Sequence, residues 1–223
     1  MSERFSPDPD NRKPFAPTEA LRSPNMGRFS VLEQFKDNPN YLLKTVSGAS
    51  REIADQYSGE SSIEKTSEIL GRMKQSALGR FLPETKLVIG ETEPGDTKLF
   101  MVTERIQGKQ LNYTETITTE IGEDIDELLA SNAEFYKDSF DDEASIGYSL
   151  DIFGFDTNIL IGRNMAKEDT EDSVYFVDAF PVFKLAPDHL IESYEPAIRR
   201  LESRQLNLPK TKAVIAQLAK LLG

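Results

Sequence analysis

The first half of the chain alternates apolar and polar residues in the pattern of a small sheet with one helix. Two apolar runs, residues 28–35 and 41–46, are separated by the turn-forming sequence KDNPN and predict a β-hairpin. Apolar residues at helical spacing then predict a helix of about four turns over residues 61–79. Ser61 and Glu64 stand at the start of this helix with the spacing of a capping box.

Strand-like runs and helical segments follow one another through the rest of the chain. The apolar runs that predict strands cover residues 85–91, 97–106, 157–163 and 173–183. The segment 121–140 has one apolar face, which includes Leu128 and Leu129, and it predicts a long helix. A helical tail is expected from about Pro187 to Leu222, with His189 on its surface.

The first 26 residues differ in composition from the rest of the chain. They contain five prolines among polar residues, which is typical of an extended arm rather than of a packed element. The first residues lack the apolar stretch of a secretory signal, and no run of roughly 18 apolar residues occurs anywhere. We therefore expect neither export nor a membrane span, and a cytoplasmic location.

Composition limits the chemistry that the chain can perform. There is no Cys and only one His, His189, so thiolate chemistry is excluded, and zinc-based hydrolysis and His-dependent triads are disfavoured. The formal net charge of −12 also disfavours binding to nucleic acids and to anionic membranes. Carboxylate, Asn and Lys side chains remain, and these suit hard cations such as magnesium and therefore phosphate chemistry.

Three residues occur in the order expected of a phosphate-binding site. Lys44 lies within an early predicted strand, Asn158 at the head of a late one, and Asp178 at the end of the next. Each also has a simpler interpretation. Lys44 could mark an edge strand, Asn158 could form a turn, and Asp178 could cap a loop.

In this order and setting, the sequence resembles the protein-kinase-like superfamily, especially its aminoglycoside-phosphotransferase and small bacterial kinase-like branch. The motif YLLKTV is similar to the strand whose Lys reaches the nucleotide phosphates, here Lys44. The helix after it would supply a Glu that pairs with this Lys. Glu64 and Glu68 are both candidates, and Glu68 is preferred because Glu64 is the capping-box acid.

Further motifs carry the same resemblance. KLFMVTERIQGKQL is similar to the strand and hinge beside the adenine, so Met101, Thr103 and Glu104 would border that pocket. FGFDTNILIG and VYFVDAFP are similar to the two segments that hold metal, so Asn158 and Asp178 would be magnesium ligands. The implied cofactors are ATP and magnesium.

The sequence also departs from the family pattern. Only Gly27 is available for a glycine-rich loop over the phosphates. The catalytic Asp of the family precedes the metal-binding Asn by five positions, where this chain has Phe153. Asp151 could act as the base if the loop is two residues longer, or Asp156 could approach from the other side.

The resemblance implies an α+β, two-lobed kinase-like fold. Residues 27–110 would form an N-lobe with a small antiparallel sheet and one helix. Residues 111–223 would form a reduced helical C-lobe, because only 45 residues follow Asp178. Residues 1–26 would be the extended arm.

Three functional interpretations are open. The first is a degenerate, pseudokinase-like module that binds nucleotide and magnesium weakly or not at all and acts through a protein partner. The second is an active ATP-dependent phosphotransferase for a small-molecule substrate. The third is a structural or interaction protein without a nucleotide site.

The stretch GFDTNILIG, residues 154–162, carries the most specific structural prediction. We expect a loop-to-strand junction packed beside the strand that ends at Asp178, with the Asn158 amide near the Asp178 carboxylate. Asp156 is assigned to holding the turn.

Overall fold

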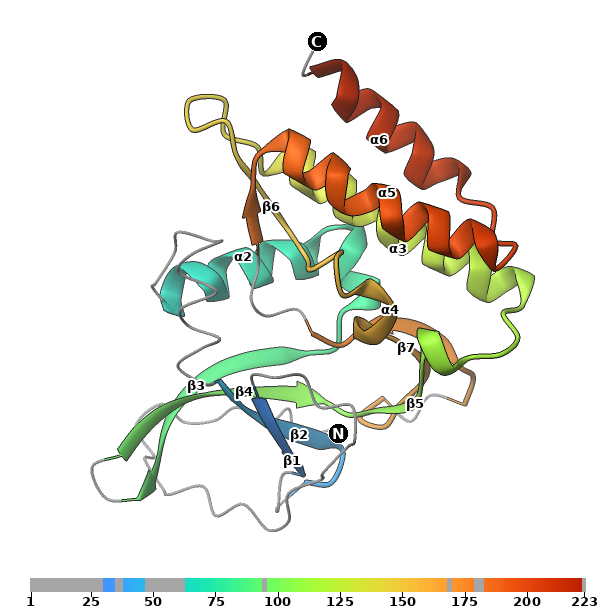
Figure 1. Ribbon diagram of the computed structural model, residues 1–223. Helices are drawn as coiled ribbons and strands as arrows, with labels where there is room; N and C mark the ends of the chain where they lie inside the picture. Colours follow the sequence, from blue (N-terminus) through green and yellow to red (C-terminus); the bar gives the residue numbers. More distant parts are fainter. Residues whose placement is uncertain are drawn as a thin grey trace.

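The computed structural model describes residues 30–34, 38–46, 63–93, 96–167, 170–178 and 183–221 of the chain. It has an α+β fold, as the sequence predicts. An antiparallel sheet lies at the bottom of Figure 1, three long helices stack at the top, and shorter elements lie between them. The predicted arm, Gly27 and Ser61 lie outside the described residues, as does the side chain of Glu64.

The lower layer is a four-stranded antiparallel sheet with strand order β1-β2-β4-β3. Its strands are β1 (Ser30–Gln34), β2 (Tyr41–Val46), β3 (Thr85–Glu93) and β4 (Asp96–Glu104). The strands β1 and β2 pair as the predicted hairpin. The bend between them is held by Asn38, whose side-chain oxygen accepts a hydrogen bond from the backbone N–H of Asn40 at 3.1 Å.

The alternation of side chains along β2 separates its two faces. Leu43 packs with Phe100 and Val102 of β4 in a small buried cluster. Lys44, the next residue, is paired in register with Met101 and therefore belongs to the opposite face, where Met101 is buried. The sequence thus directs the Lys44 side chain to the other side of the sheet from this cluster.

The helix α2 (Ile63–Gln75) lies between the sheet and the long helices (Figure 1). Its apolar residues Ile69, Leu70 and Met73 are buried in the main core. The short 3-10 helix η1 (Ala77–Phe81) follows, and Ser76 caps it by accepting a hydrogen bond from the Leu78 N–H at 3.2 Å.

The upper layer is built from α3 (Thr119–Asp138), α5 (Pro187–Ser203) and α6 (Pro209–Leu221). The predicted helical tail is thus two helices. The chain reverses between them at Gln205, which has a φ of 66°, and the Leu206 N–H donates to the Leu201 carbonyl at 3.1 Å. His189 is exposed on α5, as expected.

A buried carboxylate joins the first and last of these helices. Asp126 of α3 accepts hydrogen bonds from the backbone N–H groups of Lys210 at 3.0 Å and Thr211 at 2.9 Å, and from the Thr211 hydroxyl at 2.7 Å. The two amides belong to the first turn of α6, so Asp126 caps that helix from a distant part of the chain.

Two smaller sheets connect the layers. The larger one has the strand order β5-β7-β8 and consists of β5 (Ile106–Gln110), β7 (Ile159–Asn164) and β8 (Ser173–Phe176). The other pairs β6 (Gly147–Ser149) with β9 (Phe183–Leu185), so the apolar run 173–183 contributes to two different sheets. The short helices η2 (Leu111–Tyr113) and α4 (Phe155–Asn158) complete the fold.

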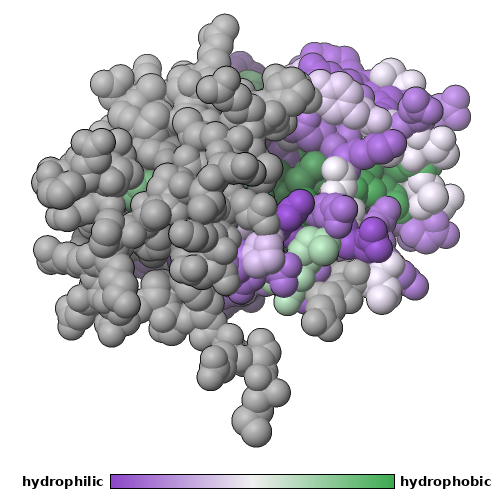
Figure 2. All heavy atoms as spheres, turned by 90° about the horizontal axis from the view of Figure 1, so that it is seen from below, coloured by the Kyte–Doolittle hydropathy of each residue, from purple (hydrophilic) through white to green (hydrophobic). Residues whose placement is uncertain are grey.

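Where described residues reach the surface in Figure 2, most of that face is hydrophilic, and hydrophobic side chains are recessed between the polar ones. Within the described ranges, no helix combines the length and the apolar character that a bilayer crossing requires.

Candidate functional site

The sheet and the remainder of the molecule meet at an ion pair between Lys44 and Asp178. The Lys44 Nζ lies 2.5 Å from the Asp178 Oδ1, and the two side chains are 12% and 36% exposed. They are 134 positions apart in the sequence. The pair therefore forms only when the first sheet docks against the β7–β8 sheet.

Asn158 lies beside Asp178 because of strand pairing. The register of β7 and β8 pairs Ile159 with Phe176, and the Val177 N–H donates to the Asn158 carbonyl at 2.8 Å. The predicted loop-to-strand junction at residues 154–162 is confirmed, with one addition. Residues 155–158 form the single helical turn α4 before the strand begins.

Asp151 completes this group of side chains. Its Oδ1 accepts the Gly154 N–H at 3.2 Å, and its Oδ2 accepts the Asn158 Nδ2 at 3.4 Å. Burial raises the pKa of Asp151, and the negative charge of Asp178 raises it further, while the hydrogen bonds from Gly154 and Asn158 oppose the shift. The loop thus brings Asp151 toward both Asn158 and Asp178.

Gly154 allows this close arrangement. A Cβ at this position would lie 2.9 Å from the Asp151 Oδ2 and 3.1 Å from the Asn158 Nδ2. Its φ of −97° is open to any residue, so the requirement for glycine comes from space and not from backbone conformation.

The two candidate bases are placed differently. Asp156 lies within α4 and forms an ion pair with Arg200 of α5. Asp151 precedes α4 and is hydrogen bonded to Asn158 at the end of that helix. The assignment of Asp156 to holding the turn is wrong, because the bonds across the turn come from Asp151 and from Thr157, whose hydroxyl donates to the Gly154 carbonyl at 2.9 Å. Phe153 is 61% exposed, so the loop carries it out toward solvent.

The hinge-like residues use their side chains to join strands. The Glu104 carboxylate is buried and accepts the Glu84 N–H at 2.7 Å and the Asn164 Nδ2 at 2.8 Å, which links the first sheet to β7. The Thr103 hydroxyl lies 2.9 Å from that of Thr85 on the neighbouring strand. Met101 is buried opposite Lys44.

Glu68, the preferred partner of Lys44, occupies an exposed position on α2 next to the buried Ile69 and Leu70. The carboxylate that contacts Lys44 at 2.5 Å belongs instead to Asp178.

A buried polar network that the sequence did not predict fixes the chain just before Asp151. The Asn132 Oδ1 accepts the Leu150 N–H at 2.9 Å, and its Nδ2 donates to the Ser149 hydroxyl at 2.9 Å and to the Tyr194 hydroxyl at 2.8 Å. The Tyr194 hydroxyl in turn donates to the Leu129 carbonyl at 2.8 Å, and burial raises its pKa. One signal was available, because Asn132 interrupts the apolar face of a strongly amphipathic segment.

The donor set suits magnesium held jointly with phosphate. In the part of the chain that the structure describes, no three Asp, Glu, His or Cys side chains gather as a metal site. Magnesium needs fewer protein ligands than that, since one or two carboxylates together with phosphates and water commonly hold it. Asp178 supplies a carboxylate, and the contact between the Asn158 Nδ2 and Asp151 leaves the Asn158 Oδ1 available as a second oxygen.

No protein-family model matches the chain, and no curated protein matches it significantly.

Proposed function

We propose that the centre formed by Lys44, Asp151, Asn158 and Asp178 binds a magnesium–nucleotide complex and transfers a phosphoryl group to a hydroxyl of a small molecule. The observation that carries this proposal is the 2.5 Å contact between Lys44 and Asp178 beside the hydrogen-bonded pair Asp151 and Asn158. Lys44, Asn158 and Asp178 occupy matching places in the kinase-like pattern of the sequence, and Asp151 lies two positions before the place of the catalytic Asp. The proposal includes a two-lobed, kinase-like arrangement of the fold.

Each residue has a distinct role in this proposal. Lys44 binds and orients the nucleotide phosphates, and Asn158 and Asp178 hold the metal. When bound, magnesium neutralises charge on the phosphate oxygens. The two carboxylates of Asp151 and Asp178 against the single ammonium of Lys44 leave a net negative corner, which favours a divalent cation.

Asp151 is the proposed general base. It takes the proton from the acceptor hydroxyl, the oxygen forms a bond to the γ-phosphorus, and the bond from that phosphorus to the bridging oxygen breaks, so the electron pair leaves with the nucleoside diphosphate. Its raised pKa makes the carboxylate a stronger base than an exposed Asp.

A second function, nucleotide binding without transfer, is favoured by one observation. Both oxygens of Asp151 already accept hydrogen bonds, one from Gly154 and one from Asn158. These bonds engage the carboxylate that would have to take the proton. In this case the module would act through a protein partner and would be pseudokinase-like.

Calorimetry with ATP, with and without MgCl₂, tests binding, and phosphorus NMR of ATP incubated with a panel of hydroxyl-bearing small molecules tests transfer. Lys44→Met and Asp178→Asn should weaken Mg–ATP binding by about tenfold or more. Asp151→Asn should retain binding and lower turnover by roughly 10²–10⁴-fold, and Asp156→Asn is the matched control that should retain both.

The outcomes separate the interpretations. If the wild-type chain binds Mg–ATP without turnover and Asp151→Asn binds it equally well, the protein is a nucleotide-binding module that does not transfer phosphate. No Mg–ATP binding by the wild-type chain at millimolar concentration, or equal binding by Asp178→Asn, would overturn the nucleotide site and leave a structural or interaction protein.

A further inference from the structure

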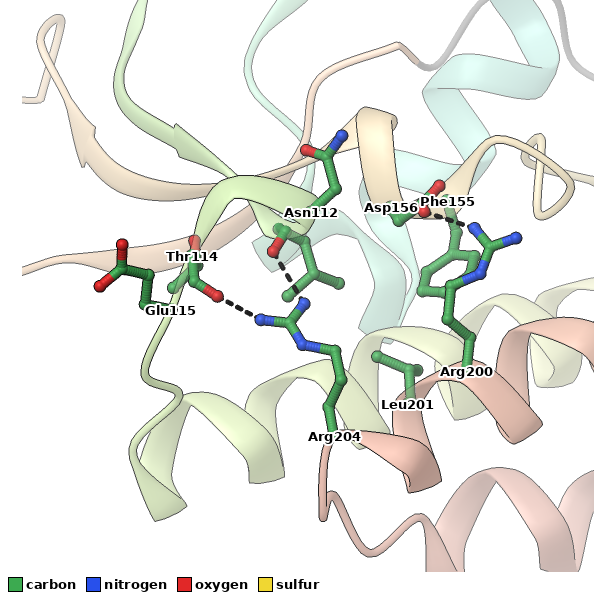
Figure 3. A pocket seen from close by; sticks show the side chains of 9 residues that line it. Asn112, Thr114, Glu115, Phe155, Asp156, Arg200, Leu201 and Arg204 are labelled. Atoms are coloured by element: carbon green, nitrogen blue, oxygen red, sulfur yellow. Dashed lines mark hydrogen bonds and ion pairs between the residues drawn. The ribbon is translucent and has the colours of Figure 1, made fainter.

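A hollow lies between η2, α4 and α5 (Figure 3). Its volume is about 370 Å³, enough for a small molecule. The side chains that line it are mainly polar, and they include two arginines from successive turns of α5, Arg200 and Arg204.

Arg204 brings a fixed positive charge to the wall of this hollow. Its guanidinium donates to the carbonyl of Leu111 at 2.8 Å and to the carbonyl of Thr114. Both acceptors are uncharged, and among the described residues no carboxylate pairs with Arg204. Two backbone bonds therefore hold the cation in one orientation without neutralising it.

Arg200 contributes a second guanidinium one turn away. It pairs with Asp156 and lies 5.8 Å from the centre of the Phe155 ring, and its side chain is 54% exposed. A guanidinium has five donors, so the contact with Asp156 leaves others for a ligand. The other acidic side chain at the hollow, Glu115, points away from both guanidinium groups in Figure 3.

The hollow is less negative than the chain as a whole, because its two arginines balance the carboxylates of Asp156 and Glu115. With a formal net charge of −12, the protein as a whole repels anions. Asp156 engages Arg200 only in part, and no described carboxylate pairs with Arg204, so guanidinium donors remain open to an anion. Guanidinium forks match carboxylate and phosphate oxygens.

We propose that this hollow binds the anionic group of a small molecule, a carboxylate or a phosphate, through Arg204 and Arg200. The site is distinct from the Lys44–Asp178 centre and does not depend on the phosphotransferase proposal. Asn112 and Thr114 at its edge offer polar groups to the rest of such a ligand.

The proposal is tested by titrating the full chain with sodium phosphate and, separately, with sodium succinate at constant ionic strength. Binding is monitored through the NMR signals of the arginine Nε–H groups. We expect saturable binding of at least one anion. The anion that binds more tightly shows whether the hollow prefers a phosphate or a carboxylate. Arg200→Gln and Arg204→Lys should weaken it by about tenfold. Arg199→Gln, a neighbour on α5 whose side chain is 70% exposed, removes the same charge and should leave binding unchanged.

Lys44→Met separates the two sites, because it should leave binding at the hollow intact. The proposal is overturned if neither anion binds the wild-type chain at tens of millimolar, or if Arg199→Gln or Lys44→Met weakens binding as much as Arg200→Gln does. Arg200 is exposed and its replacement leaves the core untouched, so its variant decides the matter even if Arg204→Lys fails to fold.

Discussion

The helical layer and the four-stranded sheet hold themselves together in different ways. The main core draws buried side chains from α2, α3, α5 and α6, whereas on the far face of the sheet the side chains that the structure describes include a cluster of Leu43, Phe100 and Val102. Yet the sheet supplies Lys44, and the remainder of the molecule supplies Asp151, Asn158 and Asp178. The candidate site thus joins a side chain of the sheet to side chains of the part of the molecule that contains the main core.

The largest effect on stability is expected inside the helical layer. Asp126→Ala removes the acceptor of three hydrogen bonds and leaves two amides of α6 unpaired in a buried place, so we expect a loss of about 3 kcal/mol in the free energy of unfolding. Asp124→Ala, on the same helix but partly exposed and paired with Arg80, should cost less than about 1 kcal/mol. Urea denaturation of both variants measures the difference, and equal losses would contradict the role given to Asp126.

A smaller effect is expected at the loop that carries the site. Gly154→Ala places a methyl group 2.9 Å from the Asp151 Oδ2, so the contact between Asp151 and Asn158 must open, at a cost of about 1–3 kcal/mol. Because the clash is local, NMR shifts should change at Asp151 and Asn158 and remain unchanged in α3. Gly122→Ala, where a Cβ would meet only Leu206 at 3.6 Å, is the control.

The ion pair between the two parts should contribute little to stability. Lys44→Met keeps the volume of the stem, and Asp178 is 36% exposed, so water can solvate its carboxylate once the ammonium is gone. We expect a change of less than about 1 kcal/mol in the free energy of unfolding. A loss as large as that of Asp126→Ala would mean that the sheet depends on this pair for docking.

The smallest effect is a dependence on pH. Because burial and Asp178 raise the pKa of Asp151 in the folded state, folding favours its protonated form. This contribution is complete below the unfolded pKa and is lost as pH rises through the folded one. The free energy of unfolding of Asp151→Asn, relative to the wild type, should therefore increase as the pH rises from below the ordinary pKa of an Asp through the raised pKa of the folded state. A difference that does not vary with pH would show that Asp151 is not desolvated.

Local patterns predicted the elements well, because hairpins and amphipathic helices are encoded over short stretches. The hairpin of β1 and β2 and the long helix α3 follow from apolar spacing and turn residues alone. The order of Lys44, Asn158 and Asp178 also suggested a shared location, and Lys44 and Asp178 are in contact. Whether they bind nucleotide remains a prediction.

The features that sequence reasoning missed depend on contacts between distant segments. The sequence left Asp151 and Asp156 as candidate bases and wrongly favoured Asp156 for holding the turn, whereas the folded chain directs Asp151 toward Asn158 and Asp156 toward Arg200. The hollow lined by Arg204 depends in the same way on carbonyls some 90 positions earlier in the chain. Neither arrangement has a signature in a window of a few residues.

The cap that Asp126 provides for α6 also sets an order of events during synthesis. The carboxylate precedes the amides that it accepts by 84 and 85 positions, so α3 is made long before its partner leaves the ribosome. Until then the charge of Asp126 must stay in water, and the surface of α3 that α6 will cover stays open. Docking of α6 is therefore a late step in folding. A chain that stops before Pro209 would leave the surface of α3 around Asp126 exposed to chaperones and proteases.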